Sequence, residues 1–467
     1  MEKELLLFQL GPVQEFIAQS ATPEDLWAGS YLLARVTLSG IDALGKCSDL
    51  IFPNLLDGTV RGAMEGPDRI PTIPNRFLAE VDASSARDVA SKVENAVRAE
   101  LVALASEAKL PEGASTQVEQ FLSTSWAVLP HNRRTWDMRE DYAAISSLLS
   151  ARRNLRNFQP WRETVDLGPK DFLSGKETAL DAKKKRGALN LIKLALPKIM
   201  KKRVEIHYPD DDKYIAVVAM DGDTMGKRLS EFKEKKDHLA FSANLVRFAQ
   251  RAIEIVRENG GSPIYVGGDD VLAVFPAKRA VKGARALYDA FVQIVGGTAS
   301  AGLAVGHEKA PMQELVTHAH AAEHRAKHVY GRDALVVDAY KRSGETVSWG
   351  GKWASKGVDA LIEFRDLLKG ELFRRFPYKL MALLGPYQLE RLGADGSAQF
   401  ADVIAAEYAH AWNQCTGSEV EDEALLLVTG YFAEVVKGTA KAVDFLNVFR
   451  CETFVNRPRD IEEEVEG

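Results

Sequence analysis

The amino-acid sequence predicts an α+β protein made of two ferredoxin-like units, with a basic helical insert between them and a helical C-terminal region. Its 467 residues correspond to about three domains of ordinary size. Two separate stretches place short apolar runs and amphipathic helices in the order strand, helix, strand, strand, helix. We expect the first unit at 1–130, the mostly helical insert at 131–205, the second unit at 206–345 and the helical region at 346–467.

Composition excludes several classes of protein. Hydrophobic residues make up 46% of the chain and charged residues 27%, which is typical of a soluble globular protein. The net charge of −6 argues against electrostatic capture of nucleic acid by the whole molecule but leaves open a local basic groove. Apolar runs are too short for a membrane span, and three distant cysteines form no disulfide framework. A cytoplasmic protein without a membrane partner is expected.

The first unit begins with an apolar strand that Gly11 and Pro12 end. Its predicted elements are, in order, a strand at 4–10, helices from about 13 and at 25–36, strands at 50–53 and 75–80, and an amphipathic helix at 84–109.

The insert has a charge balance unlike that of the whole chain. Between residues 170 and 203, eleven Lys and Arg face three acidic residues, and arginines recur among aromatic residues from 133 to 162. One interpretation is a solvated helical face, which is what most charge runs are. The other is a surface for a polyanion, or for a partner that carries one.

The second unit has the clearest periodicity. Its predicted elements are a strand at 213–223, a helix at 238–258, a hairpin at 262–275, a helix at 280–293, a strand at 298–305, a helix at 311–328 and a strand at 334–338. A break rich in Gly and Trp at 348–353 precedes the helical region at 355–452, and the acidic tail at 460–467 is expected to fray.

Four aspartates of the second unit are predicted to meet. Asp221 and Asp223 follow a buried strand, while Asp269 and Asp270 occupy the hairpin tip. In a β-α-β-β arrangement the tip lies near the end of the first strand, and carboxylates converging there repel one another unless a cation is present. Such oxygen-rich clusters suit Mg²⁺ or Mn²⁺. The preceding pair, Gly267 and Gly268, allows unusual φ values and close approach of a nucleotide to the backbone.

These residues also resemble a known family. MDGDTMG (220–226) and YVGGDDVLAVF (265–275) are similar to the second palm domain of the large subunit of type III CRISPR effector complexes. The stretches at 5–33 and 73–77 (IPNRF) resemble the first palm of the type III-B (Cmr) version. AEHRAKHVYGRDAL (322–335) resembles a family segment shared more distantly with GGDEF diguanylate cyclases, whereas 355–467 matches only in helical character.

The resemblance implies a nucleotidyltransferase that joins ATP into 3′–5′ cyclic oligoadenylates when target RNA is bound, using two Mg²⁺ or Mn²⁺ ions. It implies that Asp221 bridges the metals with help from the Gly222 carbonyl, and that Asp269 and Asp270 supply the other carboxylates. Asp223 is a weaker candidate ligand, because near the end of a strand alternate side chains need not stay on one face.

Two further residues have paired interpretations. Lys327 either contacts the triphosphate or is an exposed helix lysine, and Ser30 either touches a second nucleotide or packs between helices. The implied partners are the neighbouring backbone and small subunits of the complex, with guide RNA and target RNA bound through them. The alternative functions are a non-catalytic scaffold in the same ribonucleoprotein and a GGDEF-like cyclase acting on GTP.

The sequence departs from the family at two places. The first palm begins at residue 5 and none of the nine histidines precedes an aspartate, so no HD nuclease domain is expected. Asp171 and Ser174 stand where many members carry a cysteine pair, so no zinc is expected.

A row of histidines calls for a separate interpretation. His320, His324 and His328 share one helical face, but three imidazoles in line span about 12 Å and do not all reach one ion. We interpret them as polar helix surface.

Overall fold

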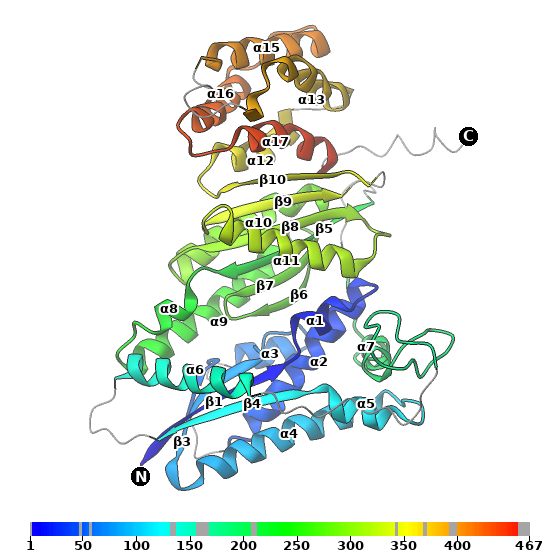
Figure 1. Ribbon diagram of the computed structural model, residues 1–467, viewed down its shortest axis with the longest axis vertical. Coiled ribbons are helices and arrows are strands. Elements are labelled where there is room, and N and C mark those ends of the chain that lie inside the picture. Colours follow the sequence, from blue (N-terminus) through cyan, green and yellow to red (C-terminus); the bar gives the residue numbers. More distant parts are fainter. Residues whose placement is uncertain are drawn as a thin grey trace.

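A computed structural model describes residues 2–45, 49–55, 58–130, 137–155, 168–206, 213–340, 344–367, 371–391 and 399–455. Three parts follow one another along the long axis of the molecule: the first sheet with its helices, the second sheet, and the C-terminal helices (Figure 1). No helix among the described residues is both long and apolar enough to cross a membrane.

The first unit is a four-stranded antiparallel sheet in the order β2-β3-β1-β4, which is the ferredoxin-like order. Its elements are β1 (Lys3–Gly11), α1 (Gln14–Ala18), α2 (Pro23–Asp42), β2 (Asp49–Phe52), α3 (Thr59–Glu65), β3 (Arg76–Asp82), α4 (Ala86–Glu107), α5 (Ala114–Phe121) and β4 (Ser123–Pro130). The sequence did not predict α3, α5 or β4. Most of β4 is half-buried, so it lacks the clean alternation of apolar and polar residues that marks a strand.

Helix α2 is buried on nearly all sides. Thr22 caps its first turn by accepting a hydrogen bond from the backbone N–H of Asp25, at 3.2 Å, and Pro23 occupies the first turn. Apolar residues of α2, including Trp27 and Leu33, share one core with strands of both sheets. The helix therefore joins the first unit to the second.

The second unit is a six-stranded sheet in the order β10-β9-β8-β5-β7-β6. Only β8 and β9 run parallel. Its elements are β5 (Tyr214–Gly222), α8 (Met225–Leu229), α9 (Lys235–Glu258), β6 (Ser262–Gly267), β7 (Asp270–Pro276), α10 (Ala277–Ile294), β8 (Ala299–His307), α11 (Met312–His328), β9 (Ala334–Tyr340) and β10 (Thr346–Lys352). The predicted α+β class with two palm-like sheets is confirmed.

The expected break at 348–353 is wrong, because most of that segment is strand β10. Trp349 pairs with Val337 of β9 and donates a hydrogen bond from its indole Nε1 to the hydroxyl of Tyr431 at 2.8 Å. A Cβ at Gly350 would lie 2.3 Å from the ring of Tyr330. The glycines that suggested a break thus make room for aromatic rings.

Strand β5 contributes to two cores. Ala216, Val218 and Met220 share one core with α9 and α10. Ile215 and Val217 lie in the other, with α2 and α11. Both faces of the sheet are covered, so the residues at the end of β5 are held by packing from both sides.

The insert contains two helices, α6 (Met138–Asn154) and α7 (Ala188–Ile199), and both pack on the first unit. Residues 168–187 form turns and two isolated bridges rather than helix, so the mostly helical prediction is wrong for this segment. Asp171 is 1% exposed and accepts hydrogen bonds from three backbone N–H groups and from Asn190. Much of the arginine-rich stretch, at 131–136 and 156–167, lies outside the described residues.

The C-terminal helices pack on β10 and on one another. They are α12 (Lys356–Leu367), α13 (Glu371–Leu384), α15 (Ala401–Thr416), α16 (Asp422–Val436) and α17 (Ala442–Val455). The acidic tail at 460–467 lies outside the described residues.

Candidate functional site

Three of the four predicted aspartates come together in the second unit. Asp221 is the second-last residue of β5, and Asp269 and Asp270 form the β6–β7 turn and the first position of β7. The pairing of β5 with β7 places the hairpin tip beside the end of β5. One carboxylate oxygen from each aspartate lies within 4.8 Å of the others. The convergence expected from the strand order is therefore present.

Glycines shape the backbone around this cluster. Gly268 has φ +68°, which side-chain-bearing residues rarely adopt. A Cβ at Gly267 would lie 2.2 Å from the hydroxyl oxygen of Tyr265, and one at Gly222 would lie 3.0 Å from the Cβ of Asp269. Gly222 and Gly267 thus let the hairpin tip, Tyr265 and the end of β5 approach one another.

Crowding perturbs the carboxylates strongly. Burial and the charge of Asp221 raise the pKa of Asp269 to about 7. Asp270 has solvent-accessible surface, but the surrounding protein, a hydrogen bond with Asp221 and the nearby charges raise its pKa well above its usual range. The raised pKa values show that the negative charges of these carboxylates are not balanced by nearby positive charge. A divalent cation would supply that balance. The oxygen ligands and their spacing fit Mg²⁺ or Mn²⁺.

Lys327 provides part of the missing positive charge. Its Nζ donates to Asp221 and lies 2.6 Å from the Oε1 of Glu323 one helical turn away. Burial by itself would lower the pKa of Lys327, but the charge of Asp221, the hydrogen bond to it and the ion pair with Glu323 raise that pKa to about 12. Lys327 is therefore a permanent cation at the cluster, and its side chain is only 16% exposed. The interpretation as an exposed helix lysine is wrong.

A cavity of about 290 Å³ lies between the two units beside this cluster. Its apolar wall comes from the first unit and includes Ile17, Leu33 and Ile73, whereas Asp221 and Asp270 line the opposite side. Helix α1 lies next to the second sheet in Figure 1, and Gln14 and Ile17 of this helix line the cavity. The site thus offers carboxylates and a cation on one side and an apolar surface on the other.

Asp223 does not join the cluster, so its prediction as a metal ligand is corrected. It is 3% exposed, and its carboxylate accepts hydrogen bonds from the hydroxyls of Thr298 and Ser300 and from the backbone N–H of Asp333. These bonds use both carboxylate oxygens. Two residues beyond Asp221, the chain has turned and directs this side chain toward β8.

Ser30 lines the cavity, but its hydroxyl is already engaged. It is 1% exposed and donates a hydrogen bond to the carbonyl of Leu26 at 3.1 Å. The structure thus shows helix packing together with a place in the cavity wall, and it leaves contact with a nucleotide as a prediction.

The histidines of α11 differ from one another. His324 and His328 are exposed and lie against each other, with ring centroids 4.2 Å apart, as expected for polar helix surface. His320 instead lines the cavity, where burial lowers its pKa. The interpretation of His320 as polar helix surface is therefore wrong, and sequence reasoning missed Glu323. The signal was their spacing, because residues seven and four positions before Lys327 lie on its helical face.

Two family descriptions match this chain. "CRISPR-associated protein Cmr2, N-terminal" matches residues 5–106, and "Cas10/Cmr2, second palm domain" matches residues 214–336, which carry the carboxylate cluster. Both matched segments are thus similar to domains of the Cas10/Cmr2 family. A curated Cas10/Cmr2 relative, the "CRISPR system Cmr subunit Cmr2" of Pyrococcus furiosus, is 31% identical over 205 residues, covering 36% of this chain. The chain spans 24% of that relative's length.

Solved structures of similar fold extend the Cas10/Cmr2 likeness over nearly the whole chain. A cryo-EM structure of a type III-B Cmr-beta complex in the apo state superposes with a TM-score of 0.64 at 11% identity, over 94% of this chain and 82% of that one. A Csm1–Csm4 cassette in complex with cA4 gives 0.57 at 14% identity, over 98% and 70%. At these identities the likeness shows the shared fold. The relationship predicted from the sequence motifs is confirmed by the family matches.

Proposed function

We propose that this chain is the catalytic subunit of a type III-B CRISPR RNA-guided complex, and that it converts ATP into 3′–5′ cyclic oligoadenylates when target RNA is bound. The observation that carries the proposal is the Asp221, Asp269 and Asp270 cluster, with Lys327 against it, in a cavity lined by both palm units. Two solved Csm1–Csm4 cassettes contain a chain of similar fold; one is in complex with AMPPNP and the other with cA4.

The residues present suit nucleotidyl transfer. In this reaction a ribose 3′-hydroxyl attacks an α-phosphate, and pyrophosphate leaves. Two divalent cations held by Asp221, Asp269 and Asp270 would supply activation of the attacking oxygen and neutralisation of the leaving group. Lys327 orients Asp221 through its hydrogen bond, and it adds a fixed positive charge for the triphosphate. The apolar wall from α1 and α2 supplies a surface for a nucleobase and excludes water from it.

The test is product formation by the assembled complex with target RNA, Mn²⁺ and labelled ATP or GTP. We expect cyclic oligoadenylate from ATP, lost on Asp269→Ala combined with Asp270→Ala. Replacing Asp289, an exposed carboxylate on α10 away from the cavity, by Ala is the matched control and is expected to retain activity.

Three results decide between this proposal and its alternatives. Product from ATP that requires Asp269 and Asp270 supports it. No product from either nucleotide would favour a scaffold whose palm is idle. Product from GTP by the isolated chain would favour a GGDEF-like cyclase.

A further inference from the structure

Strand β4 forms an open edge of the first sheet. Within the described part of the chain its one strand neighbour is β1, and it offers eight residues of backbone along the other side. The other sheet edges are shorter or covered. Strand β2 has four residues and packs beside α9, and β10 packs on α17. In β6 the backbone N–H of Val266 donates a hydrogen bond to the carbonyl of Pro71. A long open edge is a template for pairing with another extended chain.

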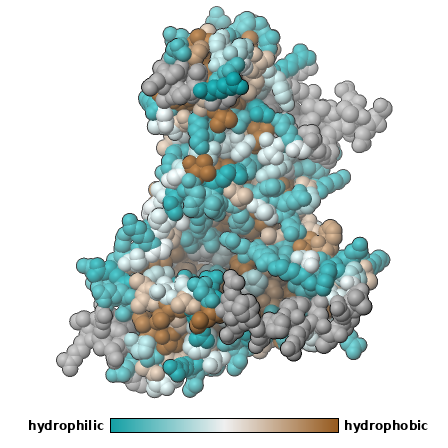
Figure 2. Space-filling model, in the orientation of Figure 1, coloured by the Kyte–Doolittle hydropathy of each residue, from teal (hydrophilic) through white to brown (hydrophobic). Residues whose placement is uncertain are grey.

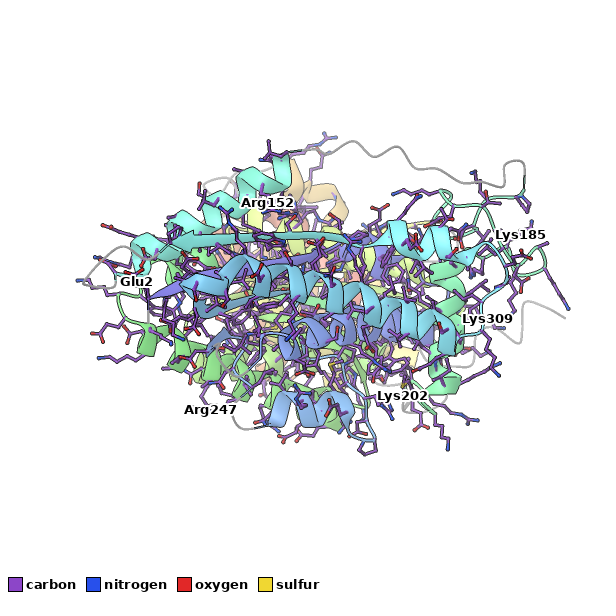
Figure 3. The ribbon with its side chains drawn as sticks, turned by 90° about the horizontal axis from the view of Figure 1, so that it is seen from below. Glu2, Arg152, Lys185, Lys202, Arg247 and Lys309 are labelled. Atoms are coloured by element: carbon purple, nitrogen blue, oxygen red, sulfur yellow. The ribbon has the colours of Figure 1, made fainter. Side chains whose placement is uncertain are left out.

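A groove runs along this edge. Helix α4 forms one wall and α6 the other, and Figure 3 shows the two helices on either side of β4. The groove has a volume of about 1260 Å³, and residues 122–128 form its floor. It is wide and open, as a strand-docking surface must be.

The walls of the groove are positively charged. Arg87 and Arg98 come from α4, Arg152 and Arg153 come from α6, and Glu94 is the one acidic residue in the lining. Arg98 pairs with Glu94 at 3.1 Å, which leaves three arginines in excess. Arg87, Arg152 and Arg153 are exposed, so their charges face whatever enters the groove.

The α6 wall also exposes apolar side chains. Leu148 is 47% exposed and Leu155 is 73% exposed, and both line the groove. Figure 2 shows apolar surface on the lower part of the molecule, where Figure 1 places α6 and β4. Charges alone would protect an edge strand from aggregation, but exposed leucines beside it work against such protection.

We propose that an extended acidic segment of a partner protein docks here as a fifth strand beside β4. Its backbone pairs with the open edge, the carboxylates on one face of the strand meet Arg87 of α4, and the apolar side chains on the other face cover Leu148 and Leu155. Arg152 and Arg153 of α6 add positive charge that attracts the acidic segment. The surface favours a peptide over a nucleic acid strand for two reasons. An open strand edge matches a peptide backbone, and the guanidinium of Arg152 already lies 4.1 Å from the ring centroid of Trp126, covering the aromatic face that a base would need. This proposal is independent of the catalytic one.

The full chain is tested with a fluorescein-labelled nine-residue peptide of alternating Glu and Val, and with the matched Lys and Val peptide. We expect the acidic peptide to bind at low salt and the basic peptide not to bind. Arg87→Glu combined with Arg153→Glu is expected to weaken binding at least tenfold. Arg247→Glu combined with Lys282→Glu reverses two exposed cations that do not line the groove and is expected to leave binding unchanged. Thermal unfolding verifies that all variants fold.

Two further measurements complete the test: amide hydrogen exchange with the peptide bound, and binding of a labelled RNA oligonucleotide. Strand addition protects amides of residues 123–130 when the acidic peptide is bound, and this result supports the proposal. Peptide binding without that protection would show a non-specific basic patch and would overturn the proposal. A labelled oligouridylate that binds with the same dependence on Arg87 and Arg153, while the peptide fails, would overturn it in favour of RNA, and the absence of any binding would reject it outright.

Discussion

The carboxylate cluster lowers the stability of the folded protein at neutral and higher pH. Asp269 and Asp270 lie beside Asp221 with one cation, Lys327, as their internal counter-charge. Their raised pKa values mean that the folded chain holds protons that the unfolded chain releases. Residues kept in such an unfavourable state are typical of functional sites rather than of structural ones.

This arrangement predicts a pH dependence of stability in the absence of metal. Because the pKa of Asp269 rises from 3.8 to about 7, its contribution to stability is complete below pH 4 and is lost as the pH rises through about 7. In EDTA at pH 8, Asp269→Asn is therefore expected to raise the melting temperature by about 2–4 °C, the shift for roughly 1 kcal/mol. At pH 5 the difference should shrink, as differential scanning fluorimetry can measure.

Manganese provides the control for that prediction. Mn²⁺ should stabilise the natural chain more than the Asp269→Asn chain at pH 8, because the ion replaces the lost protons. Identical pH profiles for the two chains in EDTA would show that Asp269 ionises normally.

At the residue scale, the sequence predicted the three clustered aspartates correctly but not the residues around them. Asp221, Asp269 and Asp270 follow from strand order, since their placement depends on which strands pair. Asp223 was misplaced because strand alternation says nothing about a chain that turns immediately after the strand. His320 was wrongly assigned to the polar surface of α11 because its burial depends on the first unit, which packs over α11 from a distant part of the sequence.

Among the elements, the turn between α11 and β9 is bound to the end of β5. Asp223 accepts a hydrogen bond from the backbone N–H of Asp333 in that turn, and two more from Thr298 and Ser300 near the start of β8. Lys327 lies in the last turn of α11, shortly before Asp333. Asp223 thus positions the helix end that carries Lys327.

Removing Asp223 should consequently impair catalysis without removing a metal ligand. Asp223→Ala leaves three donors unsatisfied and is expected to destabilise the fold by about 2–3 kcal/mol. We expect Mn²⁺ affinity, measured by calorimetry, to stay within about threefold while product formation falls by at least tenfold, roughly 1.4 kcal/mol in activation free energy.

Two comparisons make this prediction decisive. Asp221→Ala should weaken Mn²⁺ binding strongly, and Asp223→Asn should lie between Asp223→Ala and the natural chain in both activity and stability. A loss of Mn²⁺ affinity in Asp223→Ala equal to that in Asp221→Ala would restore Asp223 as a ligand.

The elements that the sequence predicted are those with strong apolar periodicity. The strands and helices from 213 to 340 are nearly all in place, because buried strands give continuous apolar runs. Strand β4 was missed because its open edge and half-buried faces remove that signal. Strand β10 was missed because its glycines accommodate Tyr330, a contact that depends on tertiary packing.

For the whole molecule, the two palm units share a core and are expected to unfold together. Leu272 of β7 lies in the same core as α2 of the first unit and is 5% exposed. Leu272→Ala should cost about 2–5 kcal/mol and should speed hydrogen exchange in α2 as well as in β7. Calorimetry should show one transition for both units.

A second leucine supplies the contrast. Leu149 of α6 is buried in a separate cluster with Leu5 and Leu7 of the first sheet. Leu149→Ala should therefore destabilise the chain by a similar amount while leaving exchange in β5 and β7 unchanged until global unfolding. Unaltered α2 exchange in Leu272→Ala would show that the two units are energetically separate.

The sequence predicted the number of sheets but not their mutual packing. Domain boundaries drawn along the chain suggested consecutive bodies, whereas α2 lies between the two sheets and α6 and α7 cover the first unit. Periodicity shows that a helix has an apolar face, and it does not show that α2 is apolar because two partners cover it.

The position of β5 between two cores predicts how its sequence varies among relatives. Its successive side chains enter two different cores, and its final residues carry Asp221 and the turn to Asp223. A substitution at any position of β5 changes the packing of one core or the other. The compensating substitutions must therefore lie in one core for one position and in the other core for the next. In an alignment of many relatives, 214–223 should therefore drift more slowly than the equally buried strands of the first sheet, and its changes should be paired with changes in two unconnected groups of residues.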